Sequence, residues 1–269
     1  MLLQRILSAT IGILYIIFML YFGGWFFKIS VLIMALILMH EFYNALIKKG
    51  YRPVKWLGYI FMLLLLYTNF ISLRSNTVII TALMTLAGLI IPVLKGETSI
   101  IDIMVSIFAA LYPGMMIIFL IPLAFQSHPY GMNLLILTLL VTWSTDTFAY
   151  FVGKSFGKRK LCPSISPNKT IEGSLGGLIG SIVVGIIYGT VLKYRLTISI
   201  NLYHFGIIGL LGGVLSQLGD LCASSIKRFC DIKDFGKLMP GHGGLLDRFD
   251  SLLFTLPAVY IYYLTFLTQ

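Results

Sequence analysis

Residues Ser174 to Leu192 read SLGGLIGSIVVGIIYGTVL and contain no charged side chain. Crossing the roughly 30 Å hydrocarbon core of a bilayer takes about 20 apolar residues at a helical rise of about 1.5 Å. Backbone amides in lipid must find their partners within the same segment, which favours a helix over irregular chain. This stretch therefore predicts a membrane-spanning helix.

Eight further runs of this kind occur along the 269 residues. The nine predicted spans are Ile6 to Phe27, Ile29 to Leu46, Trp56 to Leu73, Thr77 to Leu94, Ile101 to Phe125, Asn133 to Val152, Ser174 to Leu192, His204 to Cys222 and Ser251 to Leu267. We therefore expect an all-α, polytopic integral membrane protein with about nine transmembrane helices.

The composition excludes several other classes of protein. Hydrophobic residues make up 58% of the chain and charged residues only 11%, whereas soluble domains have about 25% charged residues. This balance argues against a water-soluble globule and a disordered chain, and three cysteines are too few for a disulfide scaffold. The net charge of +10 is spread over short loops, so we expect no nucleic-acid partner.

The positions of lysine and arginine predict the orientation of the chain. With nine spans, 16 of the 20 cations lie on the side of the N-terminus and four on the other side. Loops on the cytoplasmic side of a membrane are enriched in these residues. We therefore expect the N-terminus in the cytoplasm, a location in the cell inner (cytoplasmic) membrane, and an active site that faces the cytoplasm.

Charge and glycine content divide the chain into two parts. Residues 1–132 hold three of the ten acids and are interpreted as a scaffold of transmembrane helices. Residues 133–269 hold the other seven and are interpreted as the catalytic region, with cytoplasmic loops at 153–173 and 223–250. Glycines in the seventh and eighth runs often recur four residues apart, which favours close helix packing within the monomer or across a homodimer.

The two loops mix acidic and basic side chains, as a divalent cation bound together with a polyphosphate would require. Asp220 follows the apolar run 206–218, where an ionised carboxylate costs a few kcal/mol unless it is paired or bound to metal. A metal ligand and a partner for a buried lysine are both open interpretations. Asp146 is similar, because it could contact ligand or metal or pair with Lys154.

Asp247 and Asp250 lie three residues apart at the predicted start of the ninth span. Aspartate commonly caps a helix N-terminus, and we favour this role for Asp250. Asp247 follows the segment GHGG at 241–244, which favours metal or phosphate binding. His242 in that segment is either a general base or a histidine held by hydrogen bonds.

A second histidine and acid, His40 and Glu41, lie inside the second predicted span. Charge there is rare and usually functional. Glu41 could also pair with a cation on another helix.

Residues 224–250, SSIKRFCDIKDFGKLMPGHGGLLDRFD, closely resemble the signature of the phosphatidate cytidylyltransferases, also called CDP-diacylglycerol synthases. Three upstream elements of that family also occur, as DTFAYFVG at 146–153, SPNKTIEG at 166–173 and QLGD at 217–220. The motifs cover residues 140–255. Asn168 stands where the family often has lysine, which puts one phosphate contact in doubt, and Met239 replaces a usual Leu, Ile or Phe.

The resemblance implies that CTP and phosphatidic acid react to give CDP-diacylglycerol and pyrophosphate for phospholipid synthesis, with Mg²⁺ and with or without a second cation. It implies catalytic roles for Asp220, Asp247, Lys227 and Arg248, of which Asp220 and Asp247 would bind the metal. Substrate-binding roles are implied for Asp146, Lys169, Thr170, Glu172, Arg228, Lys233, Asp234, His242 and Gly243. The alternatives are a CTP-dependent lipid kinase, which needs the same residue types, and a membrane transporter.

Overall fold

The computed structural model describes residues 2–70, 74–96, 99–125, 127, 130–196 and 200–267. The chain forms two compact units. The first unit comprises Met1–Ile121 and Phe229–Arg248, and the second comprises Pro122–Arg228 and Phe249–Gln269. Residues 229–248, which the division by charge placed with the catalytic region, thus pack with the N-terminal helices.

The first unit is built from helices. They are α1 (Leu2–Phe22), α2 (Gly24–Lys48), α3 (Lys55–Phe70), α4 (Arg74–Lys95), α5 (Ile100–Ala109), the π-helix η1 (Ala110–Met115) and α6 (Met116–Ile118). The chain breaks between α1 and α2 at Gly23 and Gly24, whose φ angles are 54° and 49°. Only glycine adopts this left-handed region readily, so the first helix ends five residues before the predicted Phe27.

The fifth predicted run is one apolar segment but not one regular helix. It passes through α5, η1, α6 and α7 (Leu120–Phe125). Pro113 lies inside η1 and has no N–H to donate to the preceding turn. The wider π turn accommodates the proline, and the apolar run continues beyond it.

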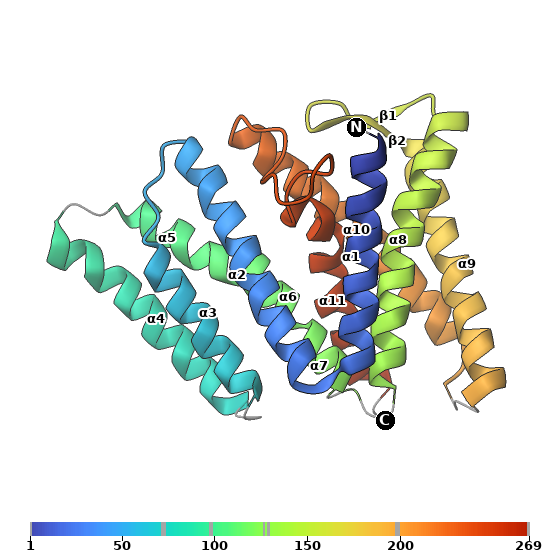
Figure 1. Ribbon diagram of the computed structural model, residues 1–269, viewed down its shortest axis with the longest axis horizontal. Helices are drawn as coiled ribbons and strands as arrows, with labels where there is room; N and C mark the ends of the chain where they lie inside the picture. Colours follow the sequence, from blue (N-terminus) through green and yellow to red (C-terminus); the bar gives the residue numbers. More distant parts are fainter. Residues whose placement is uncertain are drawn as a thin grey trace. The chain divides into compact units, whose positions relative to one another are not determined.

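The second unit contains α8 (Gly131–Phe156), β1 (Lys160–Cys162), β2 (Ser166–Thr170), α9 (Ile171–Leu196), most of α10 (Leu202–Phe229) and most of α11 (Leu246–Phe266). Strands β1 and β2 pair antiparallel and connect α8 to α9 (Figure 1). The predicted loop 153–173 is therefore shorter than expected and holds a small hairpin. The loop predicted at 223–250 shrinks to residues 230–245, because α10 and α11 extend into it from both sides.

Glycines form the contacts between α8, α9 and α10. A side chain at Gly177 would meet the carbonyl oxygen of Thr145 on α8 at 2.8 Å, and one at Gly209 would meet that of Ser181 on α9 at 2.7 Å. The absence of side chains lets the backbones approach this closely. Of the two arrangements left open for the glycines of α9 and α10, the structure shows close packing within the monomer.

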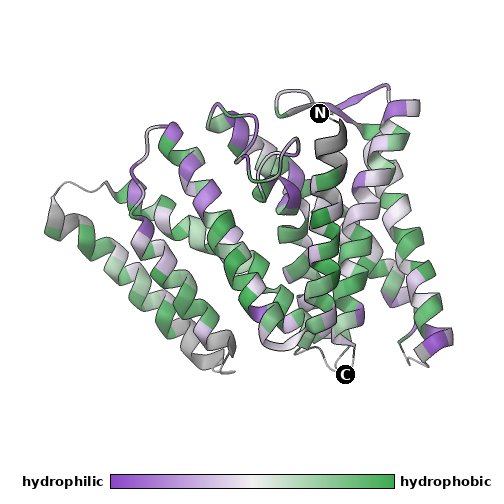
Figure 2. Cartoon of the chain, viewed as in Figure 1, coloured by the Kyte–Doolittle hydropathy of each residue, from purple (hydrophilic) through white to green (hydrophobic). Residues whose placement is uncertain are grey.

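Six helices in the described part of the chain are long and apolar enough to cross a membrane. They are Gly24–Lys48, Ile100–Phe125, Gly131–Phe156, Ile171–Arg195, Leu202–Phe229 and Leu246–Phe266. Hydrophobic residues cover most of their length, and hydrophilic residues gather at helix ends and in connecting loops (Figure 2). The prediction of a multi-pass, all-α membrane protein is confirmed, with one short hairpin added. Leu73, the predicted end of the third run, lies outside the described residues.

Candidate active site

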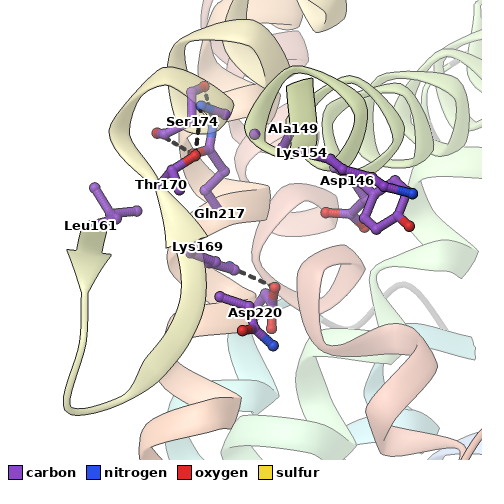
Figure 3. Close-up of a pocket in the computed structure, with 13 residues that line it drawn as sticks. Asp146, Ala149, Lys154, Leu161, Lys169, Thr170, Ser174, Gln217 and Asp220 are labelled. Atoms are coloured by element: carbon purple, nitrogen blue, oxygen red, sulfur yellow. Dashed lines mark hydrogen bonds and ion pairs between the residues drawn. The ribbon is translucent and has the colours of Figure 1, made fainter. Parts of the chain in front are cut away.

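Asp220, nine residues before the end of α10, pairs with Lys169 on strand β2. The Lys169 Nζ lies 2.5 Å from the Asp220 Oδ2, and Figure 3 shows the lysine extending from the hairpin to the carboxylate. Their side chains keep 26% and 30% of their surface exposed. Pairing with a lysine was one of the two interpretations of Asp220, and the structure shows such a pair. Both side chains remain accessible to a ligand.

The pair lies in a cavity of about 480 Å³ in the second unit. Its polar lining comes from α8, the hairpin, the start of α9 and the interior of α10: Asp146, Tyr150, Lys154, Asn168, Lys169, Thr170, Ser174, Gln217 and Asp220 (Figure 3). Ser174 and Gln217 hydrogen-bond to each other and join α9 to α10 beside this cavity. Lys154 places its ammonium 5.8 Å from the centre of the Tyr150 ring.

Asp250 is not the helix cap that the sequence predicted. Helix α11 begins at Leu246, so Asp250 lies a full turn inside it, with only 8% of its surface exposed. Its carboxylate is close enough to those of Asp220 and Asp146, and to the ammonium of Lys227, for their charges to interact. The second unit thus collects three carboxylates and the cations Lys169 and Lys227. The sequence feature that could have indicated a site role for Asp250 is its position as the last residue of the signature at 224–250.

Carboxylates such as those of this cluster are the type of ligand that Mg²⁺ prefers in proteins. Among the described residues, no group of three or more His, Cys, Asp or Glu side chains is arranged to hold a metal ion. Mg²⁺ rarely needs such a cage, because it usually binds one or two carboxylates together with waters and substrate phosphates. Asp220 and Asp250 supply such a donor set, while Asp247 belongs to the first unit.

Thr170 and Glu172, both predicted to bind substrate, stabilise the base of the hairpin. The Thr170 Oγ1 accepts the Gly173 N–H at 3.1 Å and caps helix α9. The Glu172 Oε2 accepts the N–H groups of Lys158 at 3.0 Å and Arg159 at 3.2 Å. These bonds fix the two ends of the hairpin that carries Lys169.

Arg228, another predicted substrate-binding residue, hydrogen-bonds to the turn of this hairpin. Its Nε donates to the carbonyl oxygen of Ile165 at 3.3 Å. Its contact in the structure is therefore with the loop that presents Lys169.

Asp247 organises the loop 230–245 in the first unit. Its Oδ2 accepts the backbone N–H groups of Phe235 and Gly244, each at 2.9 Å. One carboxylate oxygen thus joins the start and the end of the loop. Its predicted role as a metal ligand stays a prediction.

Glu41 on α2 binds the first amides of α11. Its Oε1 accepts the Leu245 N–H at 2.9 Å, and its Oε2 accepts the Leu246 N–H at 2.8 Å. The side chain is 6% exposed, and a Cβ at Gly236 or Gly244 would overlap with its carboxylate. The intramembrane acid is therefore used to hold the loop and the start of α11, rather than to pair with a cation of another helix as one interpretation proposed.

The loop also encloses a cavity of about 730 Å³, lined by Lys233, Asp234, Gly236, Lys237, Met239, Pro240, Gly241, His242, Gly243 and Arg248. Gly241 and Gly243 have φ angles of 79° and 87°, which explains why glycines flank the histidine. His242 shares a hydrogen bond of 2.8 Å between its Nδ1 and the Ser8 Oγ on α1. Of the two roles considered for His242, the structure thus shows the histidine held by a hydrogen bond.

The loop begins with an ion pair between Lys49 and Asp231, whose Nζ and Oδ2 are 2.7 Å apart. This hydrogen bond raises the pKa of Lys49 above its usual value. Asp231 has a φ of 54°, a left-handed conformation that ends helix α10. The neighbouring Cys230 is buried, and burial raises the pKa of its thiol.

The predicted site residues fall into two groups. The second unit holds Asp146, Lys169, Thr170, Glu172, Asp220, Lys227 and Arg228, and the first holds Lys233, Asp234, His242, Gly243, Asp247 and Arg248. Sequence reasoning left two organising residues out of the site: it interpreted Asp250 as a helix cap and did not assign the role of Glu41.

Known proteins resemble this chain over almost its whole length. It is 37% identical over 265 residues to a phosphatidate cytidylyltransferase of Bacillus subtilis (strain 168), and the match covers 96% of each chain. It is 33% identical to the phosphatidate cytidylyltransferase of Staphylococcus haemolyticus, over 96% of this chain and 97% of the relative. The phosphatidate cytidylyltransferase of Synechocystis sp. is 30% identical, over 96% of this chain and 95% of the relative. Because residues 3–266 match its family model, the chain belongs to the Cytidylyltransferase family, as the resemblance of residues 224–250 predicted.

Proposed function

We propose that the chain transfers the cytidylyl group of CTP to phosphatidic acid and releases CDP-diacylglycerol and pyrophosphate. The names of its relatives support this reaction. The observation that carries the proposal is the cluster in the second unit, where Asp220 pairs with Lys169 and the charge of Asp250 interacts with those of Asp220, Asp146 and Lys227. Mixed charge of this kind suits a triphosphate bound together with a divalent cation.

The pair of Lys169 and Asp220 explains how the cluster would accept its ligands. The ammonium of Lys169 can leave the carboxylate for a phosphate oxygen of CTP, which frees the Asp220 oxygen. Asp220 and Asp250 would then hold Mg²⁺, which supplies charge neutralisation when bound. Lys227 adds a second cation beside the phosphates. Asp247 as a metal ligand, and a second metal cation, stay predictions from the resemblance.

No general base is required in this mechanism. The phosphate of phosphatidic acid is already an anion, so the attacking oxygen needs no strong base to remove a proton. Catalysis then rests on holding the two phosphates in line and on neutralising the charge that develops. His242 accordingly has no proton-transfer step here.

The reaction is tested by following the phosphorus atoms of CTP. We expect label at the α-phosphorus to enter the lipid and label at the γ-phosphorus to leave as pyrophosphate, in detergent with Mg²⁺. A lipid kinase would place the γ label in the lipid and release CDP. No labelled lipid under any metal condition would support the transporter instead.

We further propose nine spans, with an N-terminus and active-site loops in the cytoplasm. Besides the six long helices, the structure has three shorter apolar stretches within α1, α3 and α4: Thr10–Phe22, Lys55–Tyr67 and Ile79–Ile91. Together they correspond to the nine apolar runs, and the distribution of 16 and four cations supports the orientation.

This topology predicts that Lys49, Ser164 and Lys233 face the same aqueous side. Single cysteines at these positions, in a chain without its native cysteines, should react alike with an impermeant maleimide in sealed inner-membrane vesicles of known orientation. Opposite accessibility of the residues at 164 and 233 would contradict the nine-span arrangement.

A further inference from the structure

Three cations line the loop cavity of the first unit without a carboxylate partner. Lys233, Lys237 and Arg248 all contribute to this cavity, with the single acid Asp234. In the described part of the chain, none of the three cations forms an ion pair. The excess of positive charge favours an anion that carries more than one negative charge.

A second cavity of about 700 Å³ adjoins the first, and Gly236 and Lys237 line both. Its remaining lining is Leu36, Ile37, His40, Glu41, Asn44, Tyr59, Phe235 and Leu238. The loop thus presents Lys233 to the first cavity, Phe235 and Leu238 to the second, and Lys237 to both. Leu238 keeps 56% of its surface exposed, so an apolar side chain is available beside this cavity.

The second cavity follows one face of α2, because residues 36, 40 and 44 recur at intervals of one helical turn. Asn44 lies nearest the end of the helix at Lys48, and Leu36 and Ile37 lie about two turns deeper along the span. The lining therefore changes from polar to apolar toward the membrane interior. A ligand with a charged head and a hydrocarbon tail would match this order.

We infer that the two cavities bind the lipid substrate, with the phosphate of phosphatidic acid in the cationic cavity and an acyl chain along α2. The inference rests on the proposed function. A phosphate monoester carries between one and two negative charges near neutral pH, which suits three unpaired cations. A nucleotide would match the charge of the first cavity, but its polar ribose and base lack the hydrocarbon that would match Leu36 and Ile37 at the deep end of the second. A lipid with a neutral head would match only the second.

Binding measured without turnover tests this inference. Purified full-length chain in detergent, without CTP, is titrated with dioleoyl phosphatidic acid and followed by native mass spectrometry. Leu36→Trp fills the apolar cavity and Lys237→Ala removes a cation on an exposed loop, and each should weaken binding about tenfold. Ile60→Trp is the control, because Ile60 lies on α3 beside Tyr59, is exposed and does not line the cavity.

Kinetics and competition separate the possible outcomes. The KM for dioleoyl phosphatidic acid should rise in both variants while the KM for CTP stays within about twofold, and dihexanoyl phosphatidic acid should be less sensitive to Leu36→Trp. Unchanged lipid affinity in both variants would overturn the inference even with normal turnover. Equal competition by phosphatidylglycerol, a singly charged diester, would overturn the assignment to the phosphate monoester. If both variants bind the lipid more weakly but the unsubstituted chain forms no CDP-diacylglycerol, the lipid site is supported and the proposed reaction is contradicted.

Discussion

Asp220→Asn should reduce turnover by a factor of about 10² or more, roughly 3 kcal/mol of transition-state stabilisation. The substitution keeps the shape of the side chain but removes the charged oxygen that pairs with Lys169 at 2.5 Å. A neutral amide is a poor ligand for Mg²⁺ and leaves the charge of the phosphates less compensated. Steady-state formation of CDP-diacylglycerol at saturating CTP, phosphatidic acid and Mg²⁺ measures the loss.

Asp231→Asn is the matched control for Asp220→Asn. It also removes an aspartate that pairs with a lysine, but Asp231 and Lys49 form an exposed pair outside the three cavities described above. Exposed pairs contribute about 0 to 1 kcal/mol, so activity should change little. Asp250→Asn should instead resemble Asp220→Asn, because Asp250 is buried beside Asp220. Near-normal Mg²⁺-dependent activity of Asp220→Asn would remove this residue from the metal site.

Glu41→Gln should loosen the loop 230–245 and lower activity, although Glu41 lies outside the signature. The amide keeps one acceptor oxygen, but its NH₂ group then faces the N–H of Leu245 or Leu246. A hydrogen bond to a charged group contributes about 1.5 to 3 kcal/mol, and an opposed buried donor adds a further cost. We expect a loss of roughly tenfold or more in turnover at saturating substrates, with the KM values also raised.

Cys230 reports on this loop independently of activity. The thiol is 2% exposed and burial raises its pKa, so little reactive thiolate exists near neutral pH. In a Cys162→Ser, Cys222→Ser background, Glu41→Gln should speed maleimide labelling of Cys230 by about tenfold or more. Asp102→Asn is the control, because Asp102 accepts the Arg52 N–H at 2.7 Å elsewhere in the same unit. Protected Cys230 together with normal activity would contradict a role of Glu41 in holding the loop.

The sequence by itself determined the class of fold and the family. Runs such as Ser174 to Leu192 can satisfy their backbone amides in lipid only as helices, so length and hydropathy sufficed to predict them. Glycine spacing predicted the close packing of α9 and α10, because the contact depends on the missing side chain itself, but α8 as their partner was not predicted. Asp220 was found for a similar reason, since a carboxylate at the end of an apolar run needs a partner.

Only the tertiary structure decided what the acids at the ends of helices do. Helix α11 begins at Leu246 because its first amides are taken by Glu41, which lies 205 residues earlier in the chain than Leu246. Local capping rules placed that start at Ser251 and gave Asp250 the cap, whereas the fold buries Asp250 beside Asp220. Thr170 likewise accepts the Gly173 N–H of α9, and Glu172 accepts the Lys158 N–H just before β1. Local sequence shows that unpaired helix amides need an acceptor, but distant segments that could supply one are brought near only by folding.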